Sequence, residues 1–207
     1  MTRTYAIAAV IAAVFLVGGV AAAILLAGEP ETEFAQCRGA SIAGAGDVGG
    51  PFELVSETGE TVTDETLIVE PTLVYFGYTF CPDVCPLDTV RNADAAALLD
   101  ERGMSVLPIF ISVDPQRDTP EQLTNYTDSI YDRMVGLTGT TEQIDGAVDA
   151  YRAYYNIHDS GDEYYLIDHT AFTYLVLPEH GFVDFFRREV TAEQMADRTA
   201  CFIEAAS

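Results

Sequence analysis

The stretch that most constrains the fold is an apolar, β-rich run at residues 72–78, followed at once by two closely spaced cysteines, Cys81 and Cys85. Such a run predicts a strand that is buried on both faces of a sheet. Residues 87–102 carry alanine and leucine at helical spacing and stop at a glycine, which predicts a helix. Pro86 suits the first helical turn, because its missing N–H would have no partner there. The two cysteines are therefore expected where a buried strand passes into a helix.

The rest of the chain supplies further elements of a mixed sheet. A second apolar run at residues 106–113 predicts a strand, and the helix between the two runs favours their parallel pairing. The other predicted elements are a hairpin at 52–63, a helix that begins at Thr119, a helix at 141–155, strands at 164–167, 171–177 and 182–186, and a helix at 191–205 that begins with a capping box. This order predicts an α/β fold, a thioredoxin-like mixed sheet flanked by helices.

The spacing of Cys81 and Cys85 leaves three kinds of site open. The partly positive N-terminus of a helix lowers the pKa of a cysteine, and positions four apart share one helix face, so both sulfurs can converge. Paired thiolates favour Cu(I). They also form redox couples, although the usual redox spacing is Cys-x-x-Cys rather than Cys-x3-Cys. A purely structural disulfide is the third alternative.

A copper site that also holds Cu(II) needs a further ligand, for which imidazole is the natural choice. His158 falls in a predicted polar loop and His180 in a predicted turn, so both are expected in solvent. His169 lies between two strand-like segments, where a site at the mouth of the sheet would form. It is the candidate ligand, with a neutral core histidine as the alternative, and Asp168 or a backbone carbonyl is expected to orient its ring.

Composition excludes one class of partner. The formal net charge is -23, from 33 acids against 10 bases, and all the bases are arginines. Nucleic-acid binding is not expected, because phosphate contacts need a basic face. The acidity either attracts cations and basic partners or simply keeps the surface solvated.

The N-terminus carries an apolar run at residues 6–27 without a charged side chain. At about 1.5 Å per residue, such a helix crosses a hydrocarbon core of about 30 Å. Arg3 before the run and acids after it favour a cytoplasmic N-terminus. A single-pass anchor in the inner (cytoplasmic) membrane is expected, with the soluble domain on the periplasmic side; a cleaved signal peptide is the alternative. The predicted organisation is an anchor at 1–28, a linker at 29–50 and the thioredoxin-like domain at 51–207.

Several motifs agree in order and spacing with one known family. They are Tyr-Phe-Gly-Tyr-Thr at 75–79 with Cys-Pro-Asp-Val-Cys-Pro at 81–86, the stretches 111–120 and 136–140, and Asp-His-Thr at 168–170. Over residues 51–186 the chain resembles the Sco/SenC copper-binding proteins. The resemblance implies a membrane-tethered thioredoxin-like domain and one copper ion, Cu(I) or Cu(II), held by Cys81, Cys85 and His169. It also implies an upstream copper donor, and copper delivery to, or thiol reduction at, the dinuclear copper centre of cytochrome c oxidase subunit II.

Two function classes follow from this resemblance. The preferred one is a non-enzymatic copper-binding assembly factor, or metallochaperone. The alternative is a thiol-disulfide oxidoreductase that acts through Cys81 and Cys85 without an obligatory metal. His169 discriminates between them, because copper binding needs it and dithiol exchange does not. Phe80 replaces the histidine that the family usually has before the first cysteine, a position that is not a ligand in the family.

Two further groups of residues carry open alternatives. Cys37 and Cys201 are expected to form a disulfide between the linker and the last helix, or else to remain buried or free thiols. A disulfide over so long a loop would add several kcal/mol of stability, on the order of 5 kcal/mol at most, in the chain-entropy model. Asp114, Arg117 and Asp118 form either a surface ion pair and cap or a polar shell near the cysteines.

Overall fold

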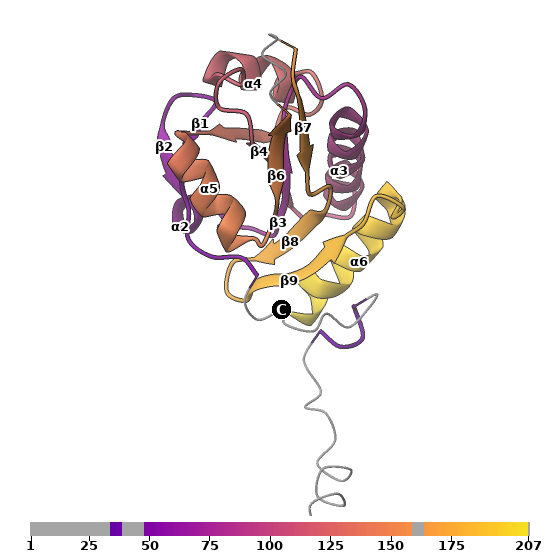
Figure 1. Cartoon of the computed structure of the whole chain (residues 1–207). Helices are drawn as coiled ribbons and strands as arrows, with labels where there is room; N and C mark the ends of the chain where they lie inside the picture. The colour runs from indigo at the N-terminus through magenta and orange to yellow at the C-terminus, as the bar shows by residue number, and fades with distance from the viewer. Residues whose placement is uncertain (1–33, 39–47, 159–163, 207) are drawn as a thin grey trace, which may run out of the picture. The chain divides into compact units, whose positions relative to one another are not determined.

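The computed structural model describes residues 34–38, 48–158 and 164–206 of the chain (Figure 1). The chain divides into two compact units, Met1–Gln36 and Cys37–Ser207. In the described part of the chain, no helix is both long enough and apolar enough to span a bilayer. The predicted anchor at residues 6–27 lies outside the described residues, so it stays a prediction, as do the predicted domain boundaries.

A seven-stranded sheet forms the centre of the unit Cys37–Ser207, in the order β2-β1-β5-β4-β3-β8-β9. The strands are β1 (Glu53–Ser56), β2 (Thr61–Thr63), β3 (Thr72–Gly77), β4 (Leu107–Ser112), β5 (Val135–Thr138), β8 (Thr173–Leu177) and β9 (Gly181–Phe186). Strands β3, β4 and β5 are parallel, whereas β1, β2, β8 and β9 pair antiparallel with their neighbours. The predicted mixed sheet, with its two buried runs paired in parallel, is confirmed.

Helices cover both faces of this sheet. They are α2 (Asp64–Leu67), α3 (Val84–Asp100), α4 (Pro120–Asp128), α5 (Thr141–Ala150) and α6 (Ala192–Ala205). Consecutive side chains of a strand point to opposite faces. In β3, Tyr75 donates to Asp88 of α3, whereas the next residue, Phe76, packs on Tyr151 at the C-cap of α5. Helices α3 and α5 therefore lie on opposite faces, and α6 packs along α3 (Figure 1).

The helix starts follow the local sequence closely. Thr119, Thr140 and Thr191 are N-caps whose side-chain oxygens accept from backbone N–H groups of α4, α5 and α6. The predicted capping box between Thr191 and Gln194 is present. These caps depend only on residues within one helical turn, which is why the sequence locates them to within a residue.

Strand β5 is missing from the sequence prediction. It has only four residues, and Gly136 in its middle weakens any strand signal. The structure shows why glycine is needed there: a Cβ atom would lie 2.8 Å from the Glu57 carboxylate and 3.0 Å from the Leu123 Cβ. The Gly136 backbone N–H donates to that carboxylate at 2.8 Å. The close approach of two segments that are distant in sequence thus explains why a glycine, which weakens the strand signal, stands in the middle of β5.

The predicted helix at 141–155 is too long, and the polar loop predicted at 156–163 is wrong for residues 156–158, while residues 159–163 lie outside the described residues. Helix α5 ends at Ala150, because Arg152 adopts a left-handed backbone with φ 51°. The chain then enters β6 (Tyr155–His158), which pairs antiparallel with β7 (Leu166–His169) in a separate two-stranded sheet. This hairpin brings the end of β7, and with it His169, to the edge of the main sheet.

Candidate metal centre

Cys81 and Cys85 lie where β3 passes into α3, as the sequence predicts, and both are free and buried. The N-cap residue of α3, Asp83, makes no side-chain cap bond. Instead, the Cys85 backbone N–H donates to the Cys81 sulfur at 3.4 Å. The sulfur therefore takes the place that a side-chain oxygen fills at other helix starts, and this position favours a thiolate.

Gly77, the last residue of β3, lets the helix approach the strand. A Cβ atom at this position would lie 2.9 Å from the Tyr75 ring, 3.0 Å from the Phe110 ring and 3.1 Å from the Cys85 sulfur. Contacts this short require one of the neighbours to move. The absence of a side chain at Gly77 thus sets how deeply Cys85 is buried.

The two thiols differ strongly in acidity. The hydrogen bond from the Cys85 thiol lowers the pKa of Cys81 well below that of an ordinary thiol, and nearby backbone N–H groups lower it further. Burial raises the pKa of Cys85, and the bond to the Cys81 sulfur raises it more. In the metal-free pair, loss of a proton is therefore favoured at Cys81 and disfavoured at Cys85.

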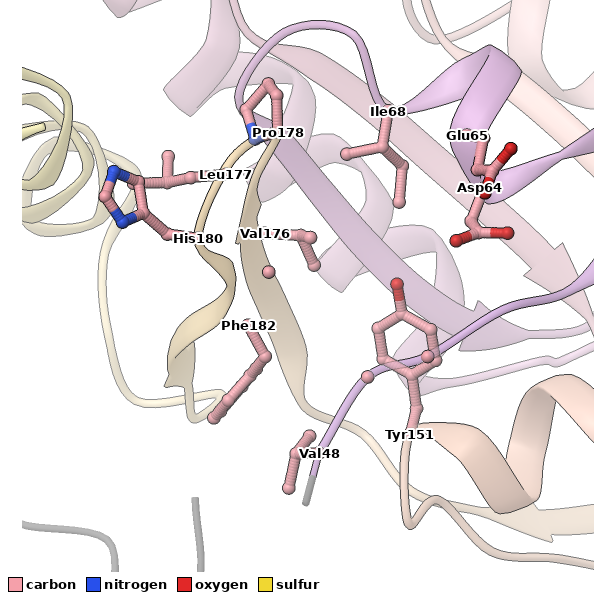
Figure 2. Close-up of a pocket in the computed structure, with 13 residues that line it drawn as sticks. Val48, Asp64, Glu65, Ile68, Tyr151, Val176, Leu177, Pro178, His180 and Phe182 are labelled. Atoms are coloured by element: carbon pink, nitrogen blue, oxygen red, sulfur yellow. The ribbon is translucent and has the colours of Figure 1, made fainter. Parts of the chain in front are cut away.

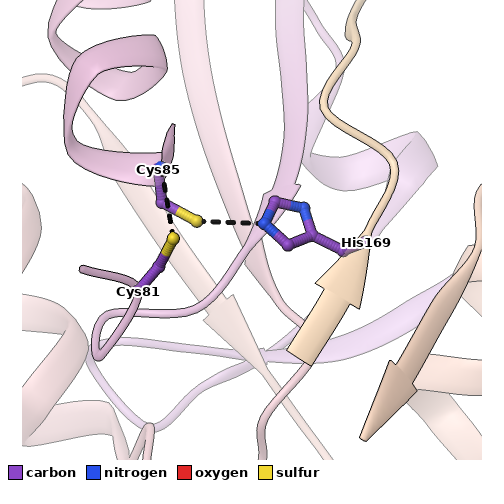
Figure 3. A group of neighbouring side chains, drawn as sticks. All are labelled: Cys81, Cys85 and His169. Atoms are coloured by element: carbon purple, nitrogen blue, oxygen red, sulfur yellow. Dashed lines mark hydrogen bonds between the residues drawn. The ribbon is translucent and has the colours of Figure 1, made fainter. Parts of the chain in front are cut away.

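His169 reaches these sulfurs from the end of β7 (Figure 3). Its Nε2 lies 3.2 Å from the Cys85 sulfur, and its Nδ1 lies 3.2 Å from the carbonyl oxygen of Thr170. When Nδ1–H donates to this carbonyl, the lone pair of Nε2 faces the sulfurs. A backbone carbonyl orients the ring, whereas Asp168 points elsewhere and pairs with His158 at 2.6 Å.

Two tyrosine rings contact the imidazole edge-to-face. The Tyr75 ring lies edge-on at 6.1 Å and the Tyr78 ring at 5.8 Å between centroids. The Tyr78 hydroxyl also accepts from the Ile167 backbone N–H at 3.3 Å, which ties β7 to the cysteine loop. The sequence did not point to either role, because the contacts join residues about 90 positions apart.

The polar residues after β4 brace the cysteine loop from the other side. Asp118 accepts from the Thr79 backbone N–H at 2.9 Å, from the Thr79 hydroxyl at 2.6 Å and from the Ser112 hydroxyl at 2.5 Å. Burial raises the pKa of Asp118. These bonds fix the segment that leads from β3 to Cys81, so the interpretation as a polar shell near the cysteines is correct for Asp118.

Asp114 and Arg117 form a buried ion pair rather than one on the surface. Asp114 also accepts from the Tyr165 hydroxyl at 2.6 Å. The Arg117 guanidinium lies 3.6 Å from the Tyr165 ring centroid and 5.6 Å from that of Tyr78. The pair therefore joins the segment after β4 to the segment that leads into β7, the strand that ends at His169.

The three donor atoms of Cys81, Cys85 and His169 lie within 4.8 Å of one another. Among the described residues they are the one group of three or more Cys, His, Asp and Glu side chains that is placed to hold a metal ion. Two sulfurs and one imidazole nitrogen are soft to intermediate donors, a set that suits copper. A cavity of about 510 Å³, lined by Cys81, His169, Val84 and Leu166 among others, opens onto the group.

Another cavity lies away from this group and has different chemistry (Figure 2). Its volume is about 580 Å³, and its lining includes Asp64, Tyr151 and His180 but no cysteine. His180 lies exposed in the turn between β8 and β9, as the sequence predicts. The described residues around it provide no group suited to a metal ion.

Comparison with known proteins gives concordant results. A family model described as SCO1/SenC matches residues 40–204. Protein SenC of Rhodobacter capsulatus is 53% identical over 204 residues, which cover 99% of this chain and 92% of that protein. The crystal structure of Arabidopsis thaliana ScoI with copper bound superposes with a TM-score of 0.71 and 36% identity, over 76% of this chain and 99% of that one. A structure of BsSco, described by its disulfide switch and as a member of the Sco family of cytochrome c oxidase assembly proteins, matches with a TM-score of 0.62 and 25% identity, over 78% of this chain and 97% of that one.

Proposed function

This chain belongs to the SCO1/SenC family, and we propose that it binds one copper ion through Cys81, Cys85 and His169 and delivers it to the dinuclear copper centre of cytochrome c oxidase subunit II. The observation that carries the proposal is the convergence of two sulfurs and the Nε2 side of an imidazole within 4.8 Å. The copper-bound ScoI structure supports the choice of metal, and the description of BsSco supports the role in oxidase assembly.

The acidity of the two thiols suggests an order of events. Cu(I) first meets the Cys81 thiolate, which carries the charge in the metal-free chain. Cys85 must lose its proton to become the second ligand, so binding releases about one proton per copper and weakens in acid. His169 offers Nε2 without a change of tautomer, because Nδ1 is already placed on a carbonyl. Three ligands leave one side open, from which a cysteine of the acceptor attacks and takes the metal by ligand exchange.

The decisive experiment is an anaerobic copper titration of the reduced full chain in detergent. One copper ion per chain is expected, whether it is supplied as Cu(I) or as Cu(II). His169→Ala should abolish Cu(II) binding and weaken Cu(I) binding, whereas His158→Ala on the neighbouring strand should change neither. Equal copper binding by the two variants would remove His169 from the site. Copper loading without transfer to the soluble domain of subunit II would contradict the proposed acceptor alone.

A thiol-disulfide oxidoreductase remains the second candidate, favoured by the unequal acidity of the cysteines. The Cys81 thiolate would attack an acceptor disulfide, and Cys85 would then displace the acceptor thiol. The products are a Cys81–Cys85 disulfide and an acceptor dithiol, with two electrons transferred. Maintenance of the subunit II thiols is a reaction of this kind. The oxidoreductase hypothesis predicts that His169→Ala keeps full reductase activity, measured by the loss of free thiols on Cys81 and Cys85.

We also propose that residues 6–27 anchor the domain in the inner membrane, with the copper centre on the periplasmic side. The support is the uncharged apolar run and Arg3 before it. Extraction with alkaline carbonate should leave the full chain in the membrane fraction, and protease added outside intact spheroplasts should digest the domain. Release by carbonate, or a mature chain that begins beyond residue 27, would favour a cleaved signal peptide.

A further inference from the structure

Exposed apolar side chains gather on the two segments that carry the candidate ligands. Among the described residues, eight large hydrophobic side chains are exposed. Three of them follow β3 in the loop and helix of the cysteines (Phe80, Leu87, Val90), four lie in or beside the β6–β7 hairpin of His169 (Tyr154, Ile157, Tyr164, Leu166), and the eighth is Val69. Single exposed hydrophobic residues are ordinary, but such a concentration marks an interaction surface.

Helix α3 reverses the usual amphipathic arrangement in its first turns. It buries the polar residues Asp88, Thr89 and Asn92, while Leu87 and Val90 are 64% and 44% exposed. The buried groups have partners: the Tyr75 hydroxyl donates to Asp88, for example, at 3.1 Å. Because most of the Leu87 side chain is exposed, folding gains little from leucine at this position.

Two apolar side chains, Val84 and Leu166, line the copper-site cavity, and the exposed Phe80 and Leu87 lie beside them along the chain; we call these four residues the apolar rim. Val84 of α3 and Leu166 of β7 line the cavity that opens onto Cys81 and His169. Phe80 is 47% exposed and precedes Cys81, and Leu87 follows Val84 on the same helix face. A protein that reaches into the cavity for copper meets Val84 and Leu166 on its wall, with Phe80 and Leu87 next to them.

Phe80 is held in place before any partner arrives. The Arg117 guanidinium lies 5.0 Å from the Phe80 ring centroid and 3.6 Å from that of Tyr165, with the ion pair to Asp114 behind it. An aromatic ring fixed in this way loses little conformational entropy on binding. It is therefore suited to act as an anchor in an interface.

The negative charge of this chain indicates which kind of protein partner it would attract. The chain has a net charge of -23 and no lysine. Six arginines form ion pairs with carboxylates of this chain: Arg91, Arg102, Arg117, Arg133, Arg188 and Arg198. Asp83 stands exposed on the cavity wall. A second copy of the chain would meet like charge, whereas a partner with basic residues around its apolar contact would be attracted.

We propose that the apolar rim docks the copper-accepting protein through an apolar loop that carries its dithiol and is bordered by basic side chains. This inference rests on the proposed function, because it assumes that copper leaves through a protein acceptor. It adds that the rim selects the acceptor: contact with Phe80, Leu87 and Leu166 brings the acceptor thiols to the open side of the site. A small thiol, which cannot span the rim, has no such advantage.

The test uses a synthetic peptide acceptor and the copper-loaded full chain in detergent, so it does not depend on which natural acceptor is correct. The peptide has a Cys-x3-Cys pair flanked by leucines, with arginines at both ends. One matched peptide has serine in place of leucine, and another has glutamate in place of arginine. Transfer rates are compared with those of a small Cu(I) chelator, for wild type, Leu87→Gln, Leu166→Gln and the control Val69→Gln.

Leu87→Gln and Leu166→Gln should each slow transfer to the leucine–arginine peptide about tenfold, the loss that one buried leucine represents. Val69→Gln should match wild type, and the chelator rate of Leu87→Gln should be unchanged. The serine and glutamate peptides should be poorer acceptors, and added salt should slow the arginine peptide. Equal rates for Leu87→Gln and Val69→Gln would overturn the proposal, as would equal rates for the leucine and serine peptides.

Two further outcomes separate this inference from the proposed function. If the chain does not load copper, the proposed function fails, and binding of the same peptides with a fluorescent label to the copper-free chain still tests the rim. A dimer in sedimentation that Leu87→Gln dissociates would assign the rim to a second copy and overturn the proposal.

Discussion

Cys37 and Cys201 are 164 positions apart in the sequence and form a disulfide, whereas Cys81 and Cys85, which are four apart, are free thiols. Both pairs are drawn from buried or nearly buried positions, so burial does not separate them. The groups around the sulfurs distinguish the two pairs. The free pair has a helix N-terminus and a backbone N–H directed at sulfur, both of which stabilise a thiolate, and an imidazole nitrogen 3.2 Å from the Cys85 sulfur. The bonded pair joins the segment before residue 39 to α6 and serves the fold.

Replacing a sulfur of the free pair should have the largest effect. Cys81→Ser or Cys85→Ser removes one soft ligand, and Cu(I) affinity should fall at least about a hundredfold. Competition with a chromogenic Cu(I) chelator measures the change. Cys37→Ser with Cys201→Ser should keep wild-type affinity. If Cys37→Ser with Cys201→Ser lost as much Cu(I) affinity as Cys81→Ser, the two cysteine pairs would not differ in their role in copper binding.

Removing the disulfide should affect stability instead. Cys37→Ala with Cys201→Ala should lower the free energy of unfolding by about 3 kcal/mol, because the unfolded chain regains a long open loop. For a domain of this size, the melting temperature should fall by roughly 6–12 °C. Thermal unfolding by circular dichroism measures it on the metal-free protein, with Cys81→Ser as the control. An unchanged melting temperature would show that the disulfide is dispensable.

The free pair should also give stability a pH dependence that the disulfide cannot. Below the ordinary thiol pKa of about 8.5, the unfolded state holds a proton that folded Cys81 lacks, so stability rises with pH. Above it, folded Cys85 keeps a proton that the unfolded state has lost, so stability falls as pH rises further. The contribution of the pair should therefore peak near the ordinary thiol pKa.

Urea unfolding of the metal-free chain between neutral and alkaline pH measures this peak. Subtracting the profile of Cys81→Ser with Cys85→Ser isolates the pair. A difference profile that is flat with pH would mean that the acidities of the two thiols are not driven apart.

The smallest expected effect tests how the imidazole is held. Tyr78→Phe removes the hydroxyl that accepts from the Ile167 backbone N–H, and it should cost about 1 kcal/mol of stability. Cu(II) affinity should fall by a few fold, on the order of the same free energy, because the end of β7 gains freedom. Tyr155→Phe, whose hydroxyl meets Asp145 at 2.6 Å, is the matched control and should leave Cu(II) affinity unchanged.

The sequence predicts the parts of this molecule that depend on neighbours along the chain. The β3 run, the helix after Pro86 and the threonine caps carry local signals, and the structure has all of them. The three candidate ligands, indicated by motif and family resemblance, come together in space. Strand β5 was missed because glycine at position 136 is required by the close approach of Glu57, which lies far away in sequence.

What sequence reasoning left open about the site depends on long-range contacts. It offered two ways to orient His169, and only the fold decides for the Thr170 carbonyl over Asp168. The tyrosine rings around the imidazole and the bonds of Asp118 to Thr79 are likewise set by packing between elements. Such contacts have no signature within a short window of residues.

The disulfide between Cys37 and Cys201 also determines how mechanical load enters the domain. Any tension along the chain from the N-terminal side reaches Cys37 first, and the sulfur bridge carries it covalently into α6. Strand β1, which follows Cys37 in the chain, is thereby bypassed while the bridge is intact. On reduction, the same tension would pass along the chain to β1, which pairs with β2 and β5. The disulfide therefore diverts tension away from β1 and so protects the sheet beside which the candidate metal centre is built.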